Sequence, residues 1–380
     1  MSEATPLDAH LEDAQRALLA ETAQLAAEVL APIARAGEEG RINAALLAAL
    51  AEHGLFARLF AGEVSAMTLC LIREGLARGC TEAETAFAVQ GLGSFPILQA
   101  GRRELVDAWL PRLAAGEGAA AFALTEPGAG SDVASLALAA ERDSGGYRLT
   151  GEKVWISNAP DALVYSVFAR TTPGAGARGL TAFAVPRDSE GLTGEHLDLV
   201  SPHPIGRLLF DGVFVPDEHV LGEVDRGFHV AMATLDLFRP SVGAFAVGMA
   251  QAALDAAVAH AAERHAFGRP LKGFQAVSHR LADVATRVQA ARLLVHSAAA
   301  AYDRGLRPVT QAAAMAKLMA TEVAQEAVDA AVQVHGARAL ERGHLLEHLY
   351  REVRAPRIYE GASEIQREII ARQLFRGTPS

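Results

Sequence analysis

Cysteine is scarce in this sequence: Cys70 and Cys80 are the only two in 380 residues. They form no CxxC pair and show no other spacing typical of a metal site, so we expect no metal centre. Two cysteines do not make the disulfide framework that stabilises many secreted domains. The cysteine content therefore favours a reducing compartment, and we expect a cytoplasmic protein.

Three further features are missing. Residues 1–12 are polar and acidic and lack the basic segment and apolar run of a signal peptide. No uninterrupted apolar run is long enough to cross a bilayer. An excess of basic residues is also absent, because the formal net charge is −10. This charge disfavours nucleic acid or an anionic membrane as the main partner, although a local site can still bind an anionic ligand.

The residues that are abundant form helices and a core. Apolar residues make up 51% of the chain and charged residues 21%, which is typical of a folded globular protein. The length favours two or three domains. Helical spacing predicts helices from residue 7 to about 113, with breaks near Pro32, at Gly37–Gly40 and between Gly91 and Pro96.

Beyond residue 113, the spacing of the apolar residues changes twice along the chain. Short apolar runs separated by turn residues predict strands at 122–124, 147–149, 154–156, 162–169, 180–185 and 208–215. Long helical runs follow at about 228–264, 274–304 and 310–335. The order of helices, strands and helices predicts an α+β protein, divided at 1–118, 119–226 and 227–380.

Near the C-terminus, Glu360 stands between Tyr359 and Gly361, just before a predicted helix. Ser363 and Gln366 have the spacing of a capping box, which predicts that the helix begins there. The helix N-terminus favours a charged carboxylate, whereas burial against Tyr359 favours the neutral acid. If burial dominates, Glu360 can be a general base for a weakly acidic C–H bond. Otherwise it is an ordinary acidic residue at a helix start.

Two stretches of the strand region have the composition of a ligand site. Residues 122–132, Phe-Ala-Leu-Thr-Glu-Pro-Gly-Ala-Gly-Ser-Asp, end a strand in two glycines whose N–H groups can approach a flat or phosphorylated ligand. Residues 151–158, Gly-Glu-Lys-Val-Trp-Ile-Ser-Asn, place one of two tryptophans beside a hydroxyl. Taken singly, the first can be an ordinary turn and the second a core tryptophan.

The motifs are much more specific in combination. Thr-Glu-Pro-Gly-Ala-Gly-Ser-Asp (125–132), Trp-Ile-Ser-Asn (155–158), Glu-Arg-His-Ala-Phe-Gly-Arg-Pro-Leu (263–271), Gln-Val-His-Gly (333–336) and Tyr-Glu-Gly (359–361) closely resemble the acyl-CoA dehydrogenase family. The resemblance covers essentially the whole chain. It implies an N-terminal helical domain, a middle β domain that is barrel-like or a sandwich, and a C-terminal domain of the four-helix-bundle type. It also implies FAD as cofactor and an acyl-CoA thioester as substrate.

The resemblance assigns the cofactor-binding residues in three groups. Those at the flavin ring are Phe122, Leu124, Thr125, Gly130, Ser131, Trp155, Ile156 and Ser157, with Ser131 also near the acyl-CoA. Those that would reach the FAD of a neighbouring subunit are Arg264, Phe267 and Gln275. Gln333, Gly336 and Glu364 complete the set. The second group implies a homo-oligomer, as a pair of dimers in this family.

For the reaction, the resemblance makes Glu360 the base that removes the α-proton, while the β-hydrogen leaves as hydride to flavin N5. Some relatives carry their base at the position held here by Phe238, which cannot accept a proton. The residues on the substrate side would be Ser131, Asp236, Arg239, Gly361 and Arg372. An electron-transfer flavoprotein is the implied electron acceptor.

Some positions depart from the family pattern. Gly336-Ala337-Arg338-Ala339 replaces Gly-Gly-x-Gly, and Ala362 replaces a common threonine, so contacts to FAD can differ. Ala88 stands where some relatives have an acidic residue in the acyl pocket, which leaves the acyl group open. Two alternatives also remain: an oxidase, monooxygenase or carrier-protein-thioester dehydrogenase of the same fold, and a non-catalytic flavoprotein scaffold.

Overall fold

The computed structural model describes residues 6–60 and 64–376. Its chain divides into two compact units, each built from separate segments. The helical unit consists of Met1–Ala31, Ser65–Glu84 and Asp236–Ser380, and the sheet unit of Pro32–Val64 and Thr85–Leu235. The boundaries of the three consecutive domains stay a prediction.

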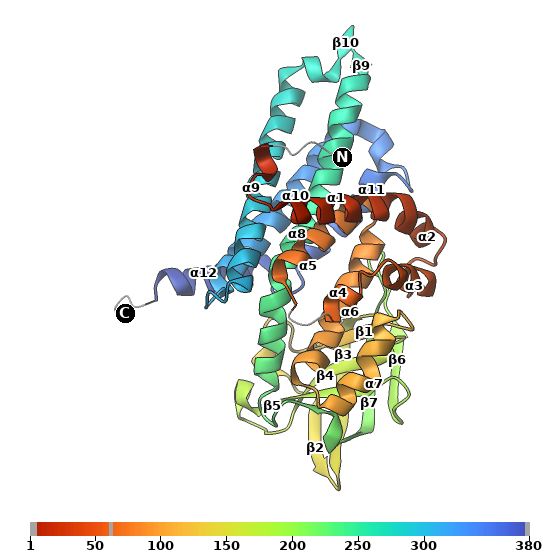
Figure 1. Cartoon of the computed structure of the whole chain (residues 1–380), viewed down its shortest axis with the longest axis vertical. Helices are drawn as coiled ribbons and strands as arrows, with labels where there is room; N and C mark the ends of the chain where they lie inside the picture. Colours follow the sequence, from red (N-terminus) through yellow and green to blue (C-terminus); the bar gives the residue numbers. More distant parts are fainter. Residues whose placement is uncertain (1–5, 61–63, 377–380) are drawn as a thin grey trace. The chain divides into compact units, whose positions relative to one another are not determined.

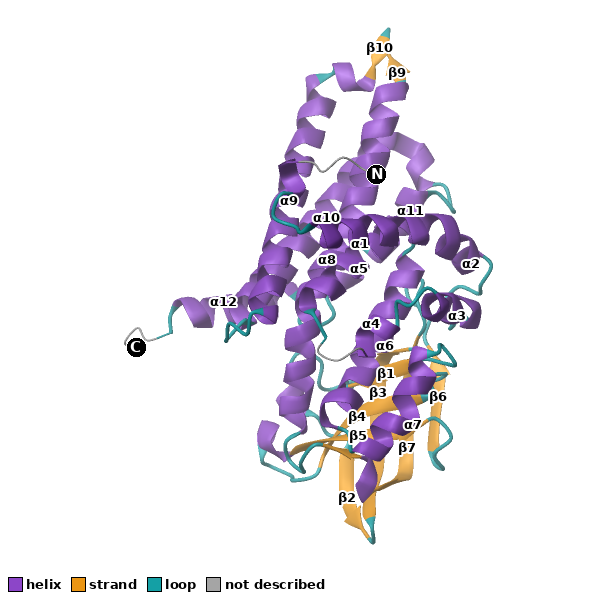
Figure 2. Cartoon of the chain, in the orientation of Figure 1, coloured by secondary structure: helices purple, strands orange, loops and turns teal. Residues whose placement is uncertain are grey.

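The sheet unit is built on one sheet, which has eight strands within the described residues (Figure 2). Its strands are β1 (Ala120–Ala123), β2 (Ala139–Asp143), β3 (Gly146–Ser157), β4 (Val164–Arg170), β5 (Leu180–Pro186), β6 (Leu192–His196), β7 (Ile205–Pro216) and β8 (Val220–Leu221). The order is β6-β7-β3-β2-β4-β5-β8, with β1 beside β4. The pairing of β3 with β7 shifts register between Lys153 and Ile156, so the strand is irregular at Trp155.

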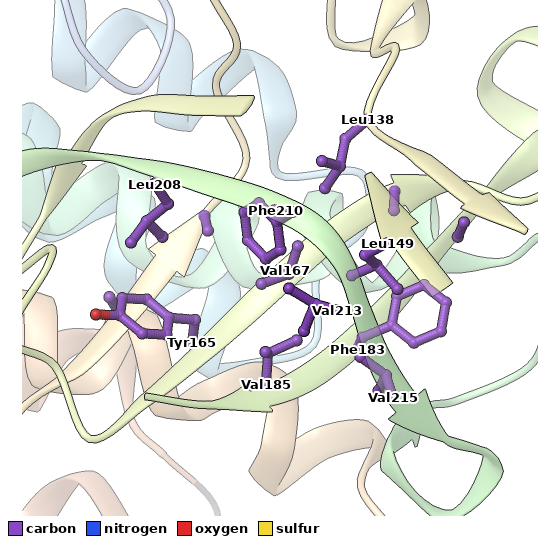
Figure 3. Close-up of a cluster of buried hydrophobic side chains, with 14 of the residues drawn as sticks. Leu138, Leu149, Tyr165, Val167, Phe183, Val185, Leu208, Phe210, Val213 and Val215 are labelled. Atoms are coloured by element: carbon purple, nitrogen blue, oxygen red, sulfur yellow. The ribbon is translucent and has the colours of Figure 1, made fainter. Parts of the chain in front are cut away.

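Alternating apolar side chains form the core of the sheet unit. Leu149 of β3, Val167 of β4, Phe183 of β5 and Phe210 of β7 point toward one another (Figure 3). All four are at most 3% exposed. This two-residue alternation is the pattern from which strands were predicted. Three short strands of this sheet, β2, β6 and β8, were missed, and β3 was predicted as two strands.

The helices of the sheet unit include α3 (Ala44–Glu52), α4 (Ala57–Phe60), α7 (Arg103–Ala114) and most of α6 (Thr81–Ala100). The predicted break between Gly91 and Pro96 is wrong, because α6 continues through both. Gly93 serves close packing instead: a Cβ there would lie 2.5 Å from the Ala121 nitrogen. The Gly93 carbonyl also accepts a hydrogen bond from Ser166 Oγ at 2.7 Å.

The helical unit contains the long helices predicted from the sequence. They are α1 (Asp13–Leu25), α5 (Ala66–Gly79), most of α8 (Gly227–Glu263), α9 (Gln275–Asp303), α10 (Thr310–His335) and α12 (Ser363–Leu374), with α11 (Leu345–Glu352) not predicted. The short strands β9 (His265–Ala266) and β10 (Arg269–Pro270) join α8 to α9, and α9 lies beside α10 (Figure 1). The break predicted near Pro32 is wrong, because a π turn at Ala26–Leu30 leads directly into α2 (Ala31–Arg35).

Two helical stretches have the length and apolar composition to cross a membrane, namely Asp13–Arg35 and Gly227–Glu263, with mean hydropathies of 1.3 and 1.5. Both contain charged side chains, so neither is an uninterrupted apolar run. In the second, 72% of the apolar window is buried, as expected for a core helix.

Lysine is rare and unusually placed. The chain has three lysines, Lys153, Lys272 and Lys317. Lys272 is exposed, whereas Lys153 in the sheet unit and Lys317 in the helical unit are both 0% exposed. Lysine is almost never fully buried unless its charge has a partner. Lys153 on β3 and Lys317 on α10 each donate a hydrogen bond to a backbone carbonyl, that of Leu124 and that of Gly361 respectively, in stretches singled out from the sequence.

Candidate active site

The turn that carries Glu360 has an unusual backbone. It lies in the helical unit between η8 (Ala355–Arg357) and α12. Glu360 has a φ of +50° and Gly361 a φ of +91°, both in the left-handed region. A non-glycine residue seldom adopts this conformation, and where it does so the surroundings must hold it there.

Side chains from two helices hold this turn. Lys317 Nζ on α10 donates to the Gly361 carbonyl at 2.7 Å, and Gln366 Nε2 on α12 donates to the same oxygen at 2.8 Å. The Gln366 amide also donates to the Glu360 carbonyl at 3.2 Å. The left-handed pair is therefore fixed through both of its carbonyl oxygens.

The predicted capping box is wrong in detail. Helix α12 does begin at Ser363, but its N-cap is Ala362, which supplies no side-chain bond. Ser363 Oγ instead donates to Glu322 Oε1 at 2.7 Å. A half-buried carboxylate on α10 has thus replaced the local backbone partner of Ser363, and Gln366 instead contacts the turn.

The Glu360 carboxyl is largely enclosed. Its Oε2 is buried, with no hydrogen-bond partner among the described residues. Burial raises the pKa of Glu360, and Arg73, Arg239 and Lys317 partly offset this rise. Of the two effects expected from the sequence, burial therefore dominates, which suits a general base.

The surrounding cations come from three helices. Arg73 on α5 is 3% exposed, pairs with Glu84 and donates to Ser241 Oγ at 2.7 Å. Ser241 in turn donates to the carbonyl of Phe238, which is buried. Arg73, Glu84 and Lys317 were not among the residues predicted from the sequence. Each is a charged residue at a buried position of an otherwise apolar helix face, and that mismatch was the available signal.

Two predicted substrate-side residues lie in this neighbourhood. Arg239 on α8 is 6% exposed, and its Nη1 lies 3.5 Å from Asp236 Oδ1. Its Nε is buried without a hydrogen-bond partner among the described residues. Burial raises the pKa of Asp236, and Arg239 opposes that effect. Arg239, one of the three cations that act on Glu360, therefore lies beside an acidic side chain of its own helix.

The glycine-rich turn of the sheet unit is held by the second buried lysine. Lys153 Nζ donates to the Leu124 carbonyl at 2.9 Å and pairs with Glu126 Oε1 at 2.8 Å. The Glu126 carboxylate also accepts the N–H groups of Ala137 and Leu138, at 2.6 and 2.9 Å. Burial lowers the pKa of Lys153 to about 8, against the effect of Glu126. These hydrogen bonds of Lys153 and Glu126 hold the backbone of the turn in place.

The exposed side of this turn fits a flat aromatic cofactor. Trp155 has a φ of +55° and leaves 52% of its side chain exposed, which is unusual for so large an apolar group. At Gly128 and Gly130 no described atom lies within 4 Å of where a Cβ would stand. Thr125 accepts the Val154 N–H at 3.0 Å, which joins the turn to β3. An open backbone beside an uncovered indole is a suitable surface for a flavin ring.

Comparison with known proteins decides the family. Three family models match in succession: the acyl-CoA dehydrogenase N-terminal domain at residues 12–117, middle domain at 121–213 and C-terminal domain at 225–375. The chain belongs to the acyl-CoA dehydrogenase family. It is therefore an FAD-dependent oxidoreductase that acts on acyl-CoA, and the predicted fold class is confirmed.

Similar proteins span nearly the whole acyl-CoA dehydrogenase chain. Cyclohexane-1-carbonyl-CoA dehydrogenase of Geobacter metallireducens is 36% identical over 363 residues, which cover 93% of this chain and 95% of that protein. Butyryl-CoA dehydrogenase from Megasphaera elsdenii superimposes with a TM-score of 0.90 at 32% identity, over 96% of this chain and 99% of that one. A structure described as the electron transferring flavoprotein of Acidaminococcus fermentans contains a chain with a TM-score of 0.91 and 32% identity, over 96% and 99% of the two chains.

Other predicted cofactor residues of this acyl-CoA dehydrogenase are exposed. Phe267, in the β9–β10 turn at the tip of α8 and α9, is 96% exposed with a φ of +50° (Figure 1). The remaining exposed members of the predicted set are Gly130, Ser131, Arg264, Gln275, Gln333, Gly336 and Glu364. Phe122, Thr125 and Ser157 are half-buried, and Leu124 is 8% exposed. Ile156 is 1% exposed and packs into the sheet core, so only its backbone is free to contact a cofactor.

Two predicted features remain outside this arrangement. Arg372 is exposed on α12 and pairs with Glu368 at 2.8 Å, so it is not among the groups acting on Glu360. Within the described residues, no group of three histidine, cysteine or acidic side chains could hold a metal ion. The glycine-rich loop that is usual in this family after the first helices is absent from the sequence between Gly54 and Ser65, and residues 61–63 of that segment lie outside the described residues.

Proposed function

We propose that Glu360 is the catalytic base of this acyl-CoA dehydrogenase. The observation that carries the proposal is its buried carboxyl, which has a raised pKa, an unpartnered oxygen and three cations nearby. The carboxylate takes the α-proton of the thioester, and the electrons of that C–H bond form the α,β double bond. FAD, when bound, accepts the β-hydrogen with its electron pair. The product is the 2-enoyl-CoA.

The residues that would hold the cofactor follow from the motifs. Phe122, Leu124, Thr125, Gly130, Ser131, Trp155, Ile156 and Ser157 would bind the flavin ring, and Gln333, Gly336 and Glu364 would bind elsewhere on FAD. The exposed indole and open glycines support the first group. Asp236, Arg239, Gly361 and Ser131 would contact the thioester substrate, with the free Nε of Arg239 as one available donor. For Arg372, the motif alone supports a substrate role.

Arg264, Phe267 and Gln275 would contact FAD in a neighbouring subunit. Their exposure at the tip of α8 and α9 supports a homo-oligomer, and we propose a pair of dimers. We also propose a cytoplasmic location, supported by the two free, buried cysteines, and an electron-transfer flavoprotein as the acceptor. Light scattering tests the assembly.

The deciding experiment is anaerobic mixing of the yellow enzyme with a panel of acyl-CoAs, including cyclohexane-1-carbonyl-CoA and butyryl-CoA. Bleaching of the flavin reports dehydrogenation. Glu360→Gln keeps the side-chain size but cannot take a proton, so bleaching should slow by about 10²–10⁴-fold or more while FAD stays bound. Bleaching at the wild-type rate in this variant would exclude Glu360 as the base.

A second base position provides a rescue control. Phe238 lies in the helical turn that Ser241 ties to Arg73. Phe238→Glu in the Glu360→Gln background should restore part of the rate, because it places a carboxylate on α8 at the position where some relatives carry their base. Reduced enzyme that stays reduced in air but passes electrons to an electron-transfer flavoprotein would distinguish a dehydrogenase from an oxidase.

A further inference from the structure

Lys317 occupies a position where a charge is unfavourable. It lies on the buried face of α10, among Ala313, Ala316, Ala320 and Thr321, and is the one charged residue buried on this fully described helix. Its side chain is 0% exposed. Burying an ammonium group requires compensating hydrogen bonds or opposite charge. Neither the fold nor the flavin motifs account for its presence.

Its contacts lead to the catalytic turn. Lys317 Nζ donates to the Gly361 carbonyl at 2.7 Å, so its hydrogen-bond partner is a carbonyl rather than a carboxylate. Gln366 donates to the same oxygen and to the Glu360 carbonyl. Lys317 and Gln366 thus hold Glu360 and Gly361 in their left-handed backbone conformation, which sets the direction of the Glu360 carboxyl.

We propose that Lys317 is a positioning residue for the catalytic base: it holds the Glu360–Gly361 turn through the Gly361 carbonyl, and its positive charge favours the carboxylate form of Glu360. The proposal rests on the assignment of Glu360 as the base. It separates two tasks within the turn. Gln366 supplies only hydrogen bonds, whereas Lys317 supplies a hydrogen bond and a charge.

The electrostatic part depends on every charged group nearby. Those acting on Glu360 are Arg73 from α5, Arg239 from α8 and Lys317 from α10. Those acting on Lys317 are Glu360, Arg239, Glu322 and Glu364, and burial lowers its pKa to about 8. Lys317 is therefore mainly protonated at pH 7 and lowers the pKa of Glu360 there. Without that charge, the pKa of Glu360 rises further.

The test is the pH dependence of kcat/KM, whose acid limb reports the base in the free enzyme. Lys317→Met should move this limb upward by about one pH unit or more, since an opposite charge near the carboxylate is lost. Lys317→Gln should move it likewise, because its amide can still donate but carries no charge. Lys317→Arg should keep the limb near the wild-type position. The variants are compared only where their FAD content and their thermal unfolding temperature match those of the wild type.

Two control variants separate the effect of the Lys317 charge from the effect of the hydrogen bonds that hold the turn. Gln366→Met removes the second donor without changing any charge, so it should lower kcat and leave the acid limb in place. Arg304→Met removes an exposed cation from the end of α9 and should change neither. If Lys317→Met does not fold, Lys317→Gln carries the test, because it retains a donor for the Gly361 carbonyl.

An acid limb that stays in place in folded Lys317→Gln and Lys317→Met would overturn the proposal and leave Lys317 as a core residue. That result is distinct from failure of the base assignment. If Glu360 were not the base, Glu360→Gln would bleach at the wild-type rate, whatever the lysine variants do.

Discussion

The two buried lysines allow a direct comparison between the units. Lys153 and Lys317 are both 0% exposed, and burial lowers the pKa of each to about 8. Each donates to a backbone carbonyl of a turn for which a function is proposed, that of Leu124 or of Gly361. They differ in their acidic partners: Lys153 pairs with Glu126 at 2.8 Å, whereas Lys317 bonds a carbonyl and acts on Glu360 through charge.

This difference shows what a buried charge can be used for. A lysine neutralised by its own carboxylate, such as Lys153 paired with Glu126, fixes the turn that is proposed to bind the flavin. A lysine without such a partner leaves its charge available to a neighbouring group that changes protonation during the reaction. We therefore expect the first to govern stability and the second to govern the pH range of activity.

The largest expected effect is the loss of stability when Lys153 is replaced. Lys153→Met leaves the Glu126 carboxylate buried without its cation, and breaking a buried pair in this way lowers the free energy of unfolding by about 3–5 kcal/mol. Adding Glu126→Gln should recover part of the loss, since the stranded charge is removed. Urea unfolding, followed by the fluorescence of released FAD, measures both. A loss below about 1 kcal/mol would mean that Lys153 does not govern stability, and the expected difference from Lys317 would be absent.

The second prediction concerns Lys317 and pH. Its pKa is about 8 in the folded protein and 10.5 in the reference state, so the unfolded chain binds more protons between these values. Wild-type stability should therefore gain up to about 1.4 kcal/mol per pH unit from this group over that range. Lys317→Met lacks the gain, so its stability relative to wild type falls from pH 8 to pH 10.5. Parallel urea curves for the two proteins that keep a constant separation would contradict this.

A smaller effect distinguishes the glycines of the two turns. Gly361→Ala forces a side chain into a φ of +91° and places its Cβ 2.5 Å from Gln366 Nε2. We expect a loss of about 1–2 kcal/mol in the free energy of unfolding, accompanied by a lower kcat. Thermal and urea unfolding measure the first, and anaerobic bleaching measures the second. Unchanged stability and rate would mean that the left-handed turn is not required.

The smallest effect is expected at Gly130, the matched control in the flavin turn. No described atom would contact its Cβ, so Gly130→Ala should change the stability of the FAD-free protein by no more than about 0.5 kcal/mol. Its affinity for FAD should fall, because the added methyl group stands on the open face. Fluorescence titration with FAD provides the measurement. An unchanged affinity would place the flavin away from this glycine.

The sequence predicted the features that depend on local pattern. Alternation predicted the main strands, helical spacing the long helices, and the motif around Glu360 a candidate base. The predictions from the sequence failed where contacts between segments that are far apart in the sequence determine the local structure. The helix continues through Gly91 and Pro96 because Gly93 packs on β1, and Ser363 abandons its capping role for a carboxylate on α10. The burial of Arg73 and Lys317 also depends on tertiary packing, and its only signal in the sequence was a charged residue on an otherwise apolar helix face.

The rarity of lysine gives this protein two internal probes of opening. Lys272 is exposed, whereas Lys153 and Lys317 are enclosed, one in each unit. An amine-reactive label applied near pH 8 should therefore modify Lys272 at once and the other two only when their surroundings open. Mass spectrometry of the labelled peptides would then report, without any substitution, how often the flavin turn and the catalytic turn each come apart.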